Sequence, residues 1–225
     1  MLRCFAWRLG TIKSNITLAL DEELVREAKV LAARRGASVS RLLADRLEEL
    51  IREERGYERA RRRAEARLAA GWDLGWTPPP PATSSMSGRS FVDTNVLVYA
   101  HDRGDGEKHA RARELVTRLW RERSGIVSTQ VLQELYVNVR RRAAAPVSAP
   151  EARALLEDYL AWPLVVNDGA TLLQALAVEE RFGLSFWDAL IVASAQVSGA
   201  EVLWSGDLND GQAYGPVVVR NPFRG

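Results

Sequence analysis

The chain has 225 residues, 47% of them hydrophobic, which is enough for one ordinary core and a smaller unit. No apolar run approaches the roughly 20 residues of a membrane-spanning helix, and the N-terminus has no signal-peptide core, so we expect a cytoplasmic protein without a membrane partner. The single cysteine excludes an internal disulfide, and two histidines cannot build a Cys/His zinc site. Any metal must therefore be bound mainly by oxygen.

Charge is distributed unevenly along the chain. Residues 1–85 carry 16 Lys and Arg against 12 Asp and Glu, whereas residues 86–225 carry 15 against 17. A basic first part is typical of a segment that contacts nucleic acid, although solvated arginines on helix surfaces give the same balance.

Residues 12–52 predict one strand and two helices. Alternating apolar residues from Ile16 to Leu20 indicate a half-buried strand, and Asp21 opens a helix that stops at Gly36. Ser38 or Ser40 caps a second helix, whose apolar stripe includes Leu43, Leu47 and Leu50. Because one short strand cannot bury these faces, we expect it to pair with the same strand of a second copy.

This arrangement resembles a ribbon-helix-helix DNA-binding domain of the kind found in VapB-like bacterial antitoxins. The resemblance implies a homodimer or higher oligomer whose ribbon enters the major groove of operator DNA, with Lys13, Asn15 and Thr17 facing the bases. Ala19 offers only a methyl contact. Alternatively, Asn15 and Thr17 form the wet face of a dimerisation ribbon.

Residues 53–75 predict an arginine-rich helical tail with a narrow apolar stripe from Tyr57 to Trp72. In antitoxins such a tail wraps the toxin and offers an arginine to its acidic active site; the inhibitory candidates here are Arg61, Arg62, Arg63 and Arg67. The alternative is a solvated helix. Residues 76–90 form a Pro/Ser-rich linker that contains Met86, which indicates a fusion of two genes.

Residues 91–225 alternate strands with helices, which predicts an α/β domain with a mainly parallel sheet flanked by helices. The first strand is expected to start at Phe91 and exit toward Ala100. Acidic residues occur at the ends of elements throughout this domain, at Asp93, Glu134, Asp188 and Asp207. Each signal is weak alone, because an aspartate in a first helical turn or a Ser-Gly-Asp turn has ordinary structural explanations.

Together, FVDTNVLVYA, the QEL of the second helix, LSFWDALIVASA and VLWSGDLNDGQ resemble the PIN-domain nucleases, most closely the VapC-like toxins. The resemblance implies that Asp93, Glu134, Asp188 and Asp207 are catalytic and bind metal, with Thr94, Asn95 and Ser205 in support and Asp210 as an outer carboxylate. It also implies RNA as substrate, cut to a 5′-phosphate and a 3′-hydroxyl. Clustered carboxylates repel one another unless a cation neutralises them, and oxygen ligands select Mg²⁺ or Mn²⁺.

These patterns lead us to expect a fused toxin-antitoxin protein, a metal-dependent endoribonuclease inhibited by its own N-terminal segment. The alternative is a DNA-binding transcriptional regulator with a catalytically silent PIN-like domain, and cleavage of DNA instead of RNA also stays open. Trp187 could stack a base, although packing in the core or rim is the favoured interpretation. His101 and His109 are expected at the surface.

Overall fold

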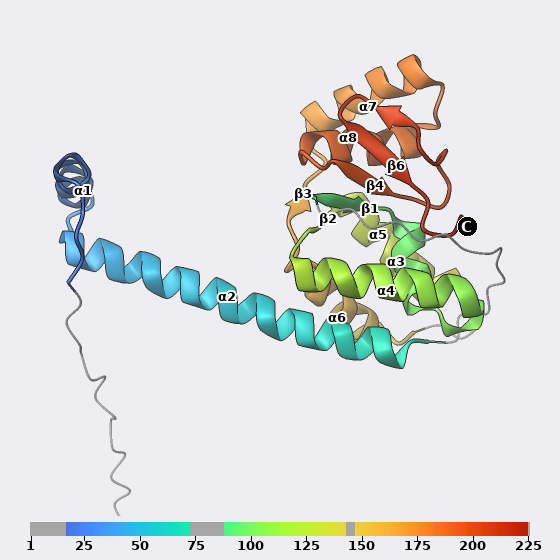
Figure 1. Ribbon diagram of the computed structural model, residues 1–225, viewed down its shortest axis with the longest axis horizontal. Helices are drawn as coiled ribbons and strands as arrows, with labels where there is room; N and C mark the ends of the chain where they lie inside the picture. The colour runs from blue at the N-terminus through green and yellow to red at the C-terminus, as the bar shows by residue number, and fades with distance from the viewer. Residues whose placement is uncertain (1–16, 73–87, 143–146, 225) are drawn as a thin grey trace, which may run out of the picture. The chain divides into compact units, whose positions relative to one another are not determined.

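The computed structural model describes residues 17–72, 88–142 and 147–224 (Figure 1). The chain divides into two compact units, Met1–Arg52 and Glu53–Gly225. The boundary falls inside one unbroken helix, α2 (Val39–Ala70), which includes both the predicted second helix and most of the arginine-rich tail. No helix among the described residues is long and apolar enough to cross a membrane.

The first unit contains α1 (Glu22–Arg34) and the start of α2. Asp21 caps α1 by accepting a hydrogen bond from the backbone N–H of Glu23 at 2.9 Å, and Gly36 follows the helix with a left-handed φ of 63°. Of the two predicted caps of α2, Ser38 has this role, since its Oγ accepts from the N–H of Arg41 at 3.1 Å.

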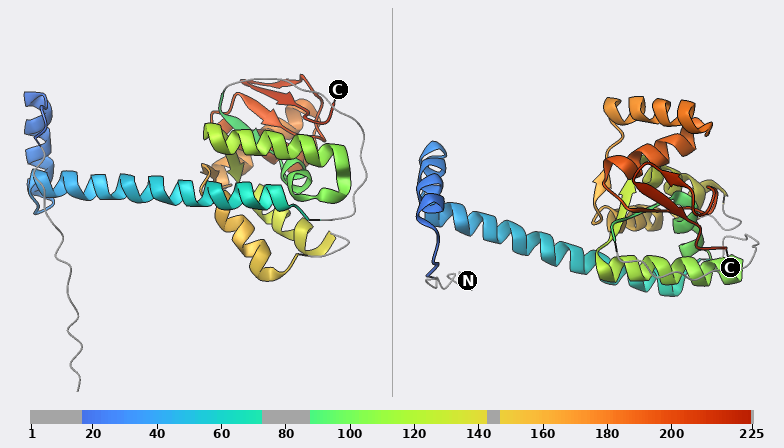
Figure 2. Two further views of the ribbon diagram at one scale, coloured as in Figure 1. Left: turned by 60° about the horizontal axis from the view of Figure 1, so that its bottom comes forward. Right: turned by 45° about the horizontal axis from the view of Figure 1, so that its top comes forward.

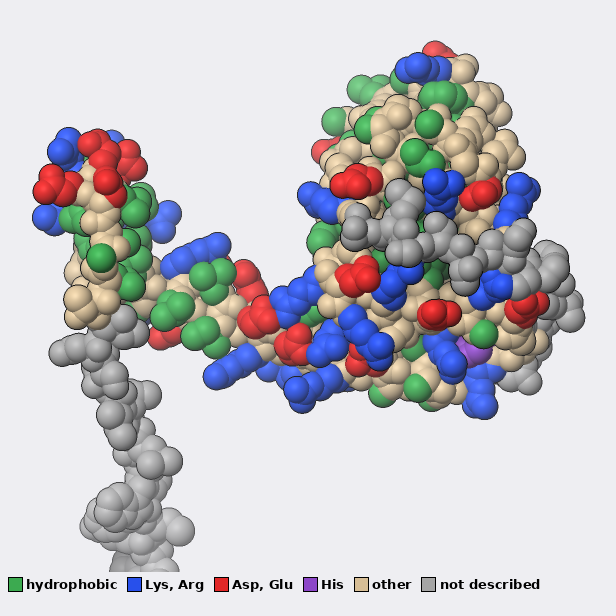
Figure 3. All heavy atoms as spheres, viewed as in Figure 1, with side chains coloured by type: hydrophobic (Ala, Val, Ile, Leu, Met, Phe, Trp, Pro, Cys, Tyr) green, Lys and Arg blue, Asp and Glu red, His purple; other side chains and the backbone are tan. Residues whose placement is uncertain are grey.

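The predicted ribbon strand is absent from the described part of this unit, because residues 17–20 have no strand partner within one chain. Thr17 is exposed, while Lys13 and Asn15 lie outside the described residues. Apolar side chains line the surface of α1, α2 and the preceding residues (Figure 3). Those exposed are Leu18, Leu20, Leu24, Val30, Leu31, Leu43, Leu47, Leu50 and Ile51.

The second unit is an α/β domain. Its strands are β1 (Ser90–Val92), β2 (Gly125–Ser128), β3 (Leu164–Val165), β4 (Val202–Trp204), β5 (Ala213–Tyr214) and β6 (Val217–Arg220). Its helices after α2 are α3 (Thr94–His101), α4 (Gly106–Glu122), α5 (Thr129–Val137), α6 (Ala149–Tyr159), α7 (Gly169–Phe182) and α8 (Phe186–Val197). Two short turns of helix, η1 (Arg103–Asp105) and η2 (Asn138–Arg142), complete the set.

The sheet has the order β3-β2-β1-β4-β6-β5, and only β5 runs antiparallel to its neighbour. This confirms the predicted α/β fold with a mostly parallel sheet flanked by helices. Successive right-handed crossovers from β1 to β2 to β3 place α3 to α6 on one face, and the return from β3 to β4 places α7 and α8 on the other (Figures 1 and 2). The strand order therefore reverses between β1 and β4.

The prediction that the strand from Phe91 continues toward Ala100 is wrong. Strand β1 ends at Val92, and Asp93 caps α3 by accepting from the N–H of Thr94 at 2.6 Å. The run is apolar on every side because both β1 and α3 are buried. Apolar composition without a period could not distinguish the helix from a strand.

The C-terminal half of α2 packs on the second unit beside α4 (Figures 1 and 2). Ala60, Ala64 and Leu68 are buried, and the Tyr57 hydroxyl donates to the carbonyl oxygen of Trp120 at 3.0 Å. The apolar stripe predicted for this segment is therefore part of a folded core. After the helix, the N–H of Trp72 donates to the carbonyl oxygen of His101 at 2.6 Å.

Ion pairs surround this contact. Asp158 of α6 is completely buried and binds both Arg63, at 2.7 Å from Nε to Oδ1, and Arg67. Arg123 pairs with Glu54 and Glu58. Because a carboxylate loses its water when buried, Asp158 depends on these arginines, and they fix the position of the helix along the surface.

The two histidines are buried, contrary to the expectation of surface positions. Nε2 of His101 lies 2.9 Å from the hydroxyl of Tyr159, and Trp72 packs against the imidazole. Burial lowers the pKa of His101 to about 3, so its ring is neutral at physiological pH. His109 bonds the carbonyl oxygen of Tyr99 at 3.1 Å, and burial lowers its pKa as well.

Candidate active site

The four predicted carboxylates line one pocket of about 200 Å³. Asp93 follows β1, Asp207 follows β4, Glu134 projects from α5, and Asp188 lies in the first turn of α8. The pocket thus lies at the carboxyl ends of the parallel strands where the strand order reverses, which is the usual place for a ligand in an open α/β sheet.

Asn95 joins two of the carboxylates. Its Nδ2 donates to Oδ2 of Asp93 at 2.8 Å and to Oδ2 of Asp207 at 2.9 Å, while its Oδ1 accepts from the N–H of Gly206 at 2.9 Å. Ser205 is fully buried and donates to Oδ2 of Asp93 at 2.7 Å. Asn95 and Ser205 therefore orient Asp93 and Asp207 toward each other, as their predicted supporting role requires.

A second set of hydrogen bonds orients Glu134. The Thr94 hydroxyl donates to Oε2 at 2.9 Å, and Nε2 of Gln130 donates to Oε1 at 2.9 Å. The same Gln130 nitrogen lies 3.2 Å from the carbonyl oxygen of Trp187, so one buried amide connects α5 to the start of α8. Gln130 was missed in the sequence, although its spacing of four residues before Glu134 places both side chains on one helical face.

Asp188 lines the pocket from the first turn of α8. Ser185 caps α8 by accepting from the N–H of Asp188 at 3.2 Å, and its hydroxyl donates to the Asp188 carboxylate at 2.7 Å. The aspartate thus serves the helix terminus, where a negative charge is favourable, and also faces the pocket.

Asp93 is the most perturbed member of the set. Burial raises its pKa to about 7, with a further rise from the neighbouring charges of Asp207 and Glu134; the hydrogen bonds from Ser205 and Thr94 oppose the shift. A cation bound in this pocket would therefore stabilise the ionised form of Asp93.

The donor set fits a hard divalent cation, since the titratable groups in the pocket lining are all carboxylates. The carboxylates are nevertheless turned toward Asn95, Thr94, Gln130 and Ser185. Within residues 17–72, 88–142 and 147–224, no group of three or more His, Cys, Asp or Glu side chains is arranged to hold a metal ion. A cation would thus have to draw these side chains together.

Other predicted residues lie elsewhere. Asp210 does not line the pocket; its Oδ1 accepts from the N–H of Asn221 at 2.8 Å, and Asn221 in turn donates to the carbonyl oxygen of Gly206 at 3.1 Å. It therefore supports the turn that carries Asp207.

The four candidate arginines do not line the carboxylate pocket. Arg63 and Arg67 bind Asp158, and Arg61 pairs with Glu58 and Glu65 of its own helix. Arg62 is exposed. The expectation that α2 presents an arginine to the acidic site is thus not met by the described arrangement, because the apolar stripe orients the neighbouring arginines toward α6.

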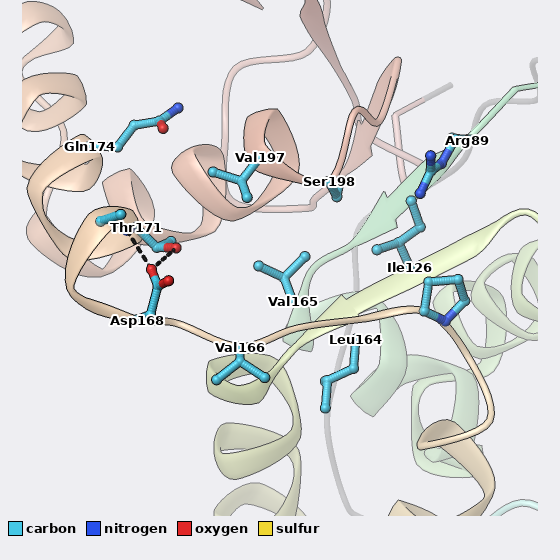
Figure 4. A pocket seen from close by; sticks show the side chains of 12 residues that line it. Arg89, Ile126, Leu164, Val165, Val166, Asp168, Thr171, Gln174, Val197 and Ser198 are labelled. Carbon is cyan, nitrogen blue, oxygen red and sulfur yellow. Dashed lines mark hydrogen bonds between the residues drawn. The ribbon is translucent and has the colours of Figure 1, made fainter. Parts of the chain in front are cut away.

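A larger hollow of about 450 Å³ lies at the free edge of the sheet beside β3 (Figure 4). Its lining is mostly apolar, and its one carboxylate, Asp168, caps α7 through bonds from the N–H and hydroxyl of Thr171, both 2.9 Å. The smaller acidic pocket is therefore the better candidate for chemistry.

The structure resembles three solved structures, in each case with a low TM-score. VapC20 of Mycobacterium tuberculosis, a sarcin-ricin loop cleaving toxin, is 23% identical over 52% of this chain and 91% of its own, with a TM-score of 0.41. A toxin-antitoxin complex from Klebsiella pneumoniae is 17% identical over 57% of this chain and 95% of its own, with a TM-score of 0.39. VapBC2 from Rickettsia felis, bound to a DNA fragment from its promoter, is 17% identical over 59% and 97%, with a TM-score of 0.44.

No curated protein sequence matches the chain. The PIN domain family, in contrast, matches residues 90–210, which is more than half of the sequence and includes every carboxylate of the pocket. The chain belongs to the PIN-domain family.

Proposed function

We propose that the chain is a cytoplasmic, metal-dependent endoribonuclease of the VapC-like type, fused to an antitoxin-like N-terminal segment. The observation that carries the proposal is the convergence of Asp93, Glu134, Asp188 and Asp207 on one pocket at the carboxyl ends of β1 and β4. Membership of the PIN-domain family and the motifs around these residues support a nuclease, and the resemblance to VapC-like toxins favours RNA.

The four carboxylates would hold Mg²⁺ or Mn²⁺. When bound, the ion supplies Lewis-acid activation of a phosphodiester and neutralises charge that develops on it. Thr94, Asn95 and Ser205 hold the carboxylates in place, and Gln130 fixes Glu134 from the other side. Hydrolysis adds water across the P–O3′ bond and leaves a 5′-phosphate and a 3′-hydroxyl.

The test uses the full chain with a fluorescently labelled single-stranded RNA. Cleavage is expected with Mg²⁺ or Mn²⁺, and it should disappear with EDTA and in Asp93→Asn. Glu180→Gln, which removes an exposed carboxylate of α7, is the matched control and should cleave like the wild type. If neither the folded wild type nor a folded variant with Arg61, Arg62, Arg63 and Arg67 replaced by glutamine cleaves varied RNAs with either metal, the DNA-binding regulator is favoured instead. Cleavage of DNA alone would change the substrate class.

The N-terminal unit is proposed to dimerise as a ribbon-helix-helix domain and bind operator DNA through Lys13, Asn15 and Thr17. The exposed apolar side chains of α1 and α2 support dimerisation, because so many leucines at helical spacing call for a partner surface. Light scattering should report a dimer or higher oligomer, and Leu47→Glu should shift it toward monomer. A monomeric wild type at micromolar concentration would contradict this part of the proposal.

Restraint of the nuclease by the N-terminal segment is also part of the proposal. If Arg61, Arg62, Arg63 or Arg67 acts in the acidic pocket, α2 must first leave Asp158 or serve a second copy. The variant Asp158→Asn, which weakens the hold on Arg63 and Arg67, should then lower cleavage, and adding Arg63→Gln and Arg67→Gln should restore it. Unchanged cleavage in all of these variants would exclude inhibition by Arg63 and Arg67.

A further inference from the structure

Trp187 is exposed at the carboxylate pocket, contrary to the expectation that it packs in the core or rim. Its relative exposure is 62%, and the residue lines the pocket together with Asp188, Asn138 and Glu134. An indole left in water forfeits a large hydrophobic gain, so a tryptophan at the mouth of a binding pocket indicates a ligand with an aromatic face.

The backbone beneath this side chain is held firmly. Trp187 lies in the first turn of α8 behind the Ser185 cap, and its carbonyl oxygen accepts from Gln130 at 3.2 Å. Because the same Gln130 amide binds Glu134, the start of α8 is connected to a carboxylate of the proposed metal site. The ring itself contacts Phe186 edge to face, with centroids 5.4 Å apart. Trp187 is therefore an exposed ring on a fixed support.

The pocket lining includes apolar residues as well as carboxylates. Val98 and Ile191, both almost fully buried, line the same hollow as the carboxylates, so the wall of the pocket is partly apolar. A phosphate could approach these carboxylates only beside a bound cation, whereas a nucleobase needs an aromatic or apolar surface on which to stack. The pocket lining contains both the carboxylates and the Trp187 ring. A nucleotide needs both, because its phosphate would lie beside the bound cation and its base would stack on the ring.

We propose that Trp187 stacks on an unpaired nucleobase next to the scissile phosphate and thereby makes the nuclease select single-stranded RNA, with Gln130 as the positioning residue that fixes the distance from this ring to Glu134. The proposal rests on the proposed ribonuclease function. A paired base cannot offer its face to the indole without leaving the duplex.

Binding is measured first, in the full chain carrying Asp93→Asn so that RNA is not cut. Titration with a single-stranded RNA in Mg²⁺ should quench tryptophan fluorescence, and this quenching should be lost when Trp187→Phe is added. Trp187→Ala should weaken binding by roughly 5- to 150-fold, the range for loss of one stacked base, and Trp187→Phe by less. A duplex of the same sequence should quench little.

Cleavage then identifies the stacked base. Substrates with one abasic nucleotide at successive positions around the cut should reveal one position at which the wild type loses activity and Trp187→Ala loses nothing further. Leu173→Ala, which truncates a side chain exposed on α7, should match the wild type on every substrate. Gln130→Met should lower kcat on every substrate, because it loosens Glu134 as well as the ring.

The two proposals can fail separately. If RNA quenches Trp187 but neither the wild type nor the variant with the four candidate arginines replaced by glutamine cuts RNA, the ribonuclease function is wrong and the base contact stands. If the wild type cuts RNA while folded Trp187→Ala shows the same kcat/KM and the same abasic profile, the stacking inference is wrong. Equal quenching by duplex and single strand, or quenching by neither, would also overturn it.

Discussion

Replacement of Asp93 by asparagine tests whether burial, with the neighbouring carboxylates, disfavours the ionised form of Asp93 in the folded protein. The pKa of Asp93 rises from an ordinary 3.8 to about 7 on folding. The folded state therefore binds this proton more tightly than the unfolded state between these two pH values, and stability falls as pH rises through that window. At about 1.4 kcal/mol per pKa unit, the ionised side chain lowers the free energy of unfolding by about 4 kcal/mol above pH 7.

The asparagine of this variant carries no charge, but its amide cannot replace every bond of the carboxylate. Asp93 accepts from Thr94, Asn95 and Ser205, and an amide nitrogen facing the Asn95 amide forfeits one of these bonds, worth about 1–2 kcal/mol. Asp93→Asn should thus be about 2 kcal/mol more stable than the wild type at pH 8 without metal. At pH 4, where Asp93 of the folded wild type is protonated, the gain should vanish or change sign.

Urea unfolding in EDTA from pH 4 to pH 8 measures this difference directly. Addition of Mg²⁺ or Mn²⁺ at pH 8 should stabilise the wild type more than the variant, since binding to the folded state alone adds stability. A stability difference that does not change between pH 4 and pH 8 would refute the reasoning, because folding would then not raise the pKa of Asp93.

Three further predictions concern packing and charge. Gly125→Ala should lower the melting temperature of the folded chain by several degrees, because a Cβ there would lie 2.5 Å from the Trp162 ring; an unchanged melting temperature would show that the ring can move. Asn95→Asp should abolish RNA cleavage and lower stability at pH 8 in EDTA, since it places a third negative charge between two carboxylates that the amide now joins. Residues 53–225 should give a cooperative melting curve, whereas residues 86–225 should melt at least about 10 °C lower or aggregate, because deletion of α2 uncovers buried apolar surface and leaves a buried aspartate unpaired; equal melting temperatures would contradict this.

The sequence predicted the residues of the candidate site better than it predicted the secondary structure that surrounds them. Asp93, Glu134, Asp188 and Asp207 were each a weak signal alone and were assigned through the combined resemblance to PIN-domain nucleases, and they do line one pocket. The connection from β1 into α3 was not recognisable, because both elements are buried and their shared run of apolar residues has no period. Asp93 itself is the helix cap that separates them.

Contacts between residues far apart in the sequence could not be predicted either. The stripe of Tyr57, Ala60, Ala64 and Leu68 predicted an apolar helical face, but only the fold brings Trp120 and Asp158 against it. Local patterns indicate which face of a helix is buried, but they do not identify the residues against which that face packs. The four arginines were candidates for the acidic pocket because of the resemblance to antitoxins, and the pairing of Arg63 and Arg67 with Asp158 could not be predicted from the local pattern.

The helix α2 and the nuclease surface that it covers belong to one chain, so their association does not follow the concentrations of two separate proteins. A helix supplied by a separate protein dissociates on dilution, and its occupancy follows the ratio of the two components. Here the helix is continuous with its receptor through residues 73–87, so the ratio is fixed at one and docking is intramolecular, with an effective concentration on the order of millimolar that does not depend on how much protein is present. Release of α2 from its own domain, its exchange with a second copy or a cut in the chain would change how much of this surface is covered.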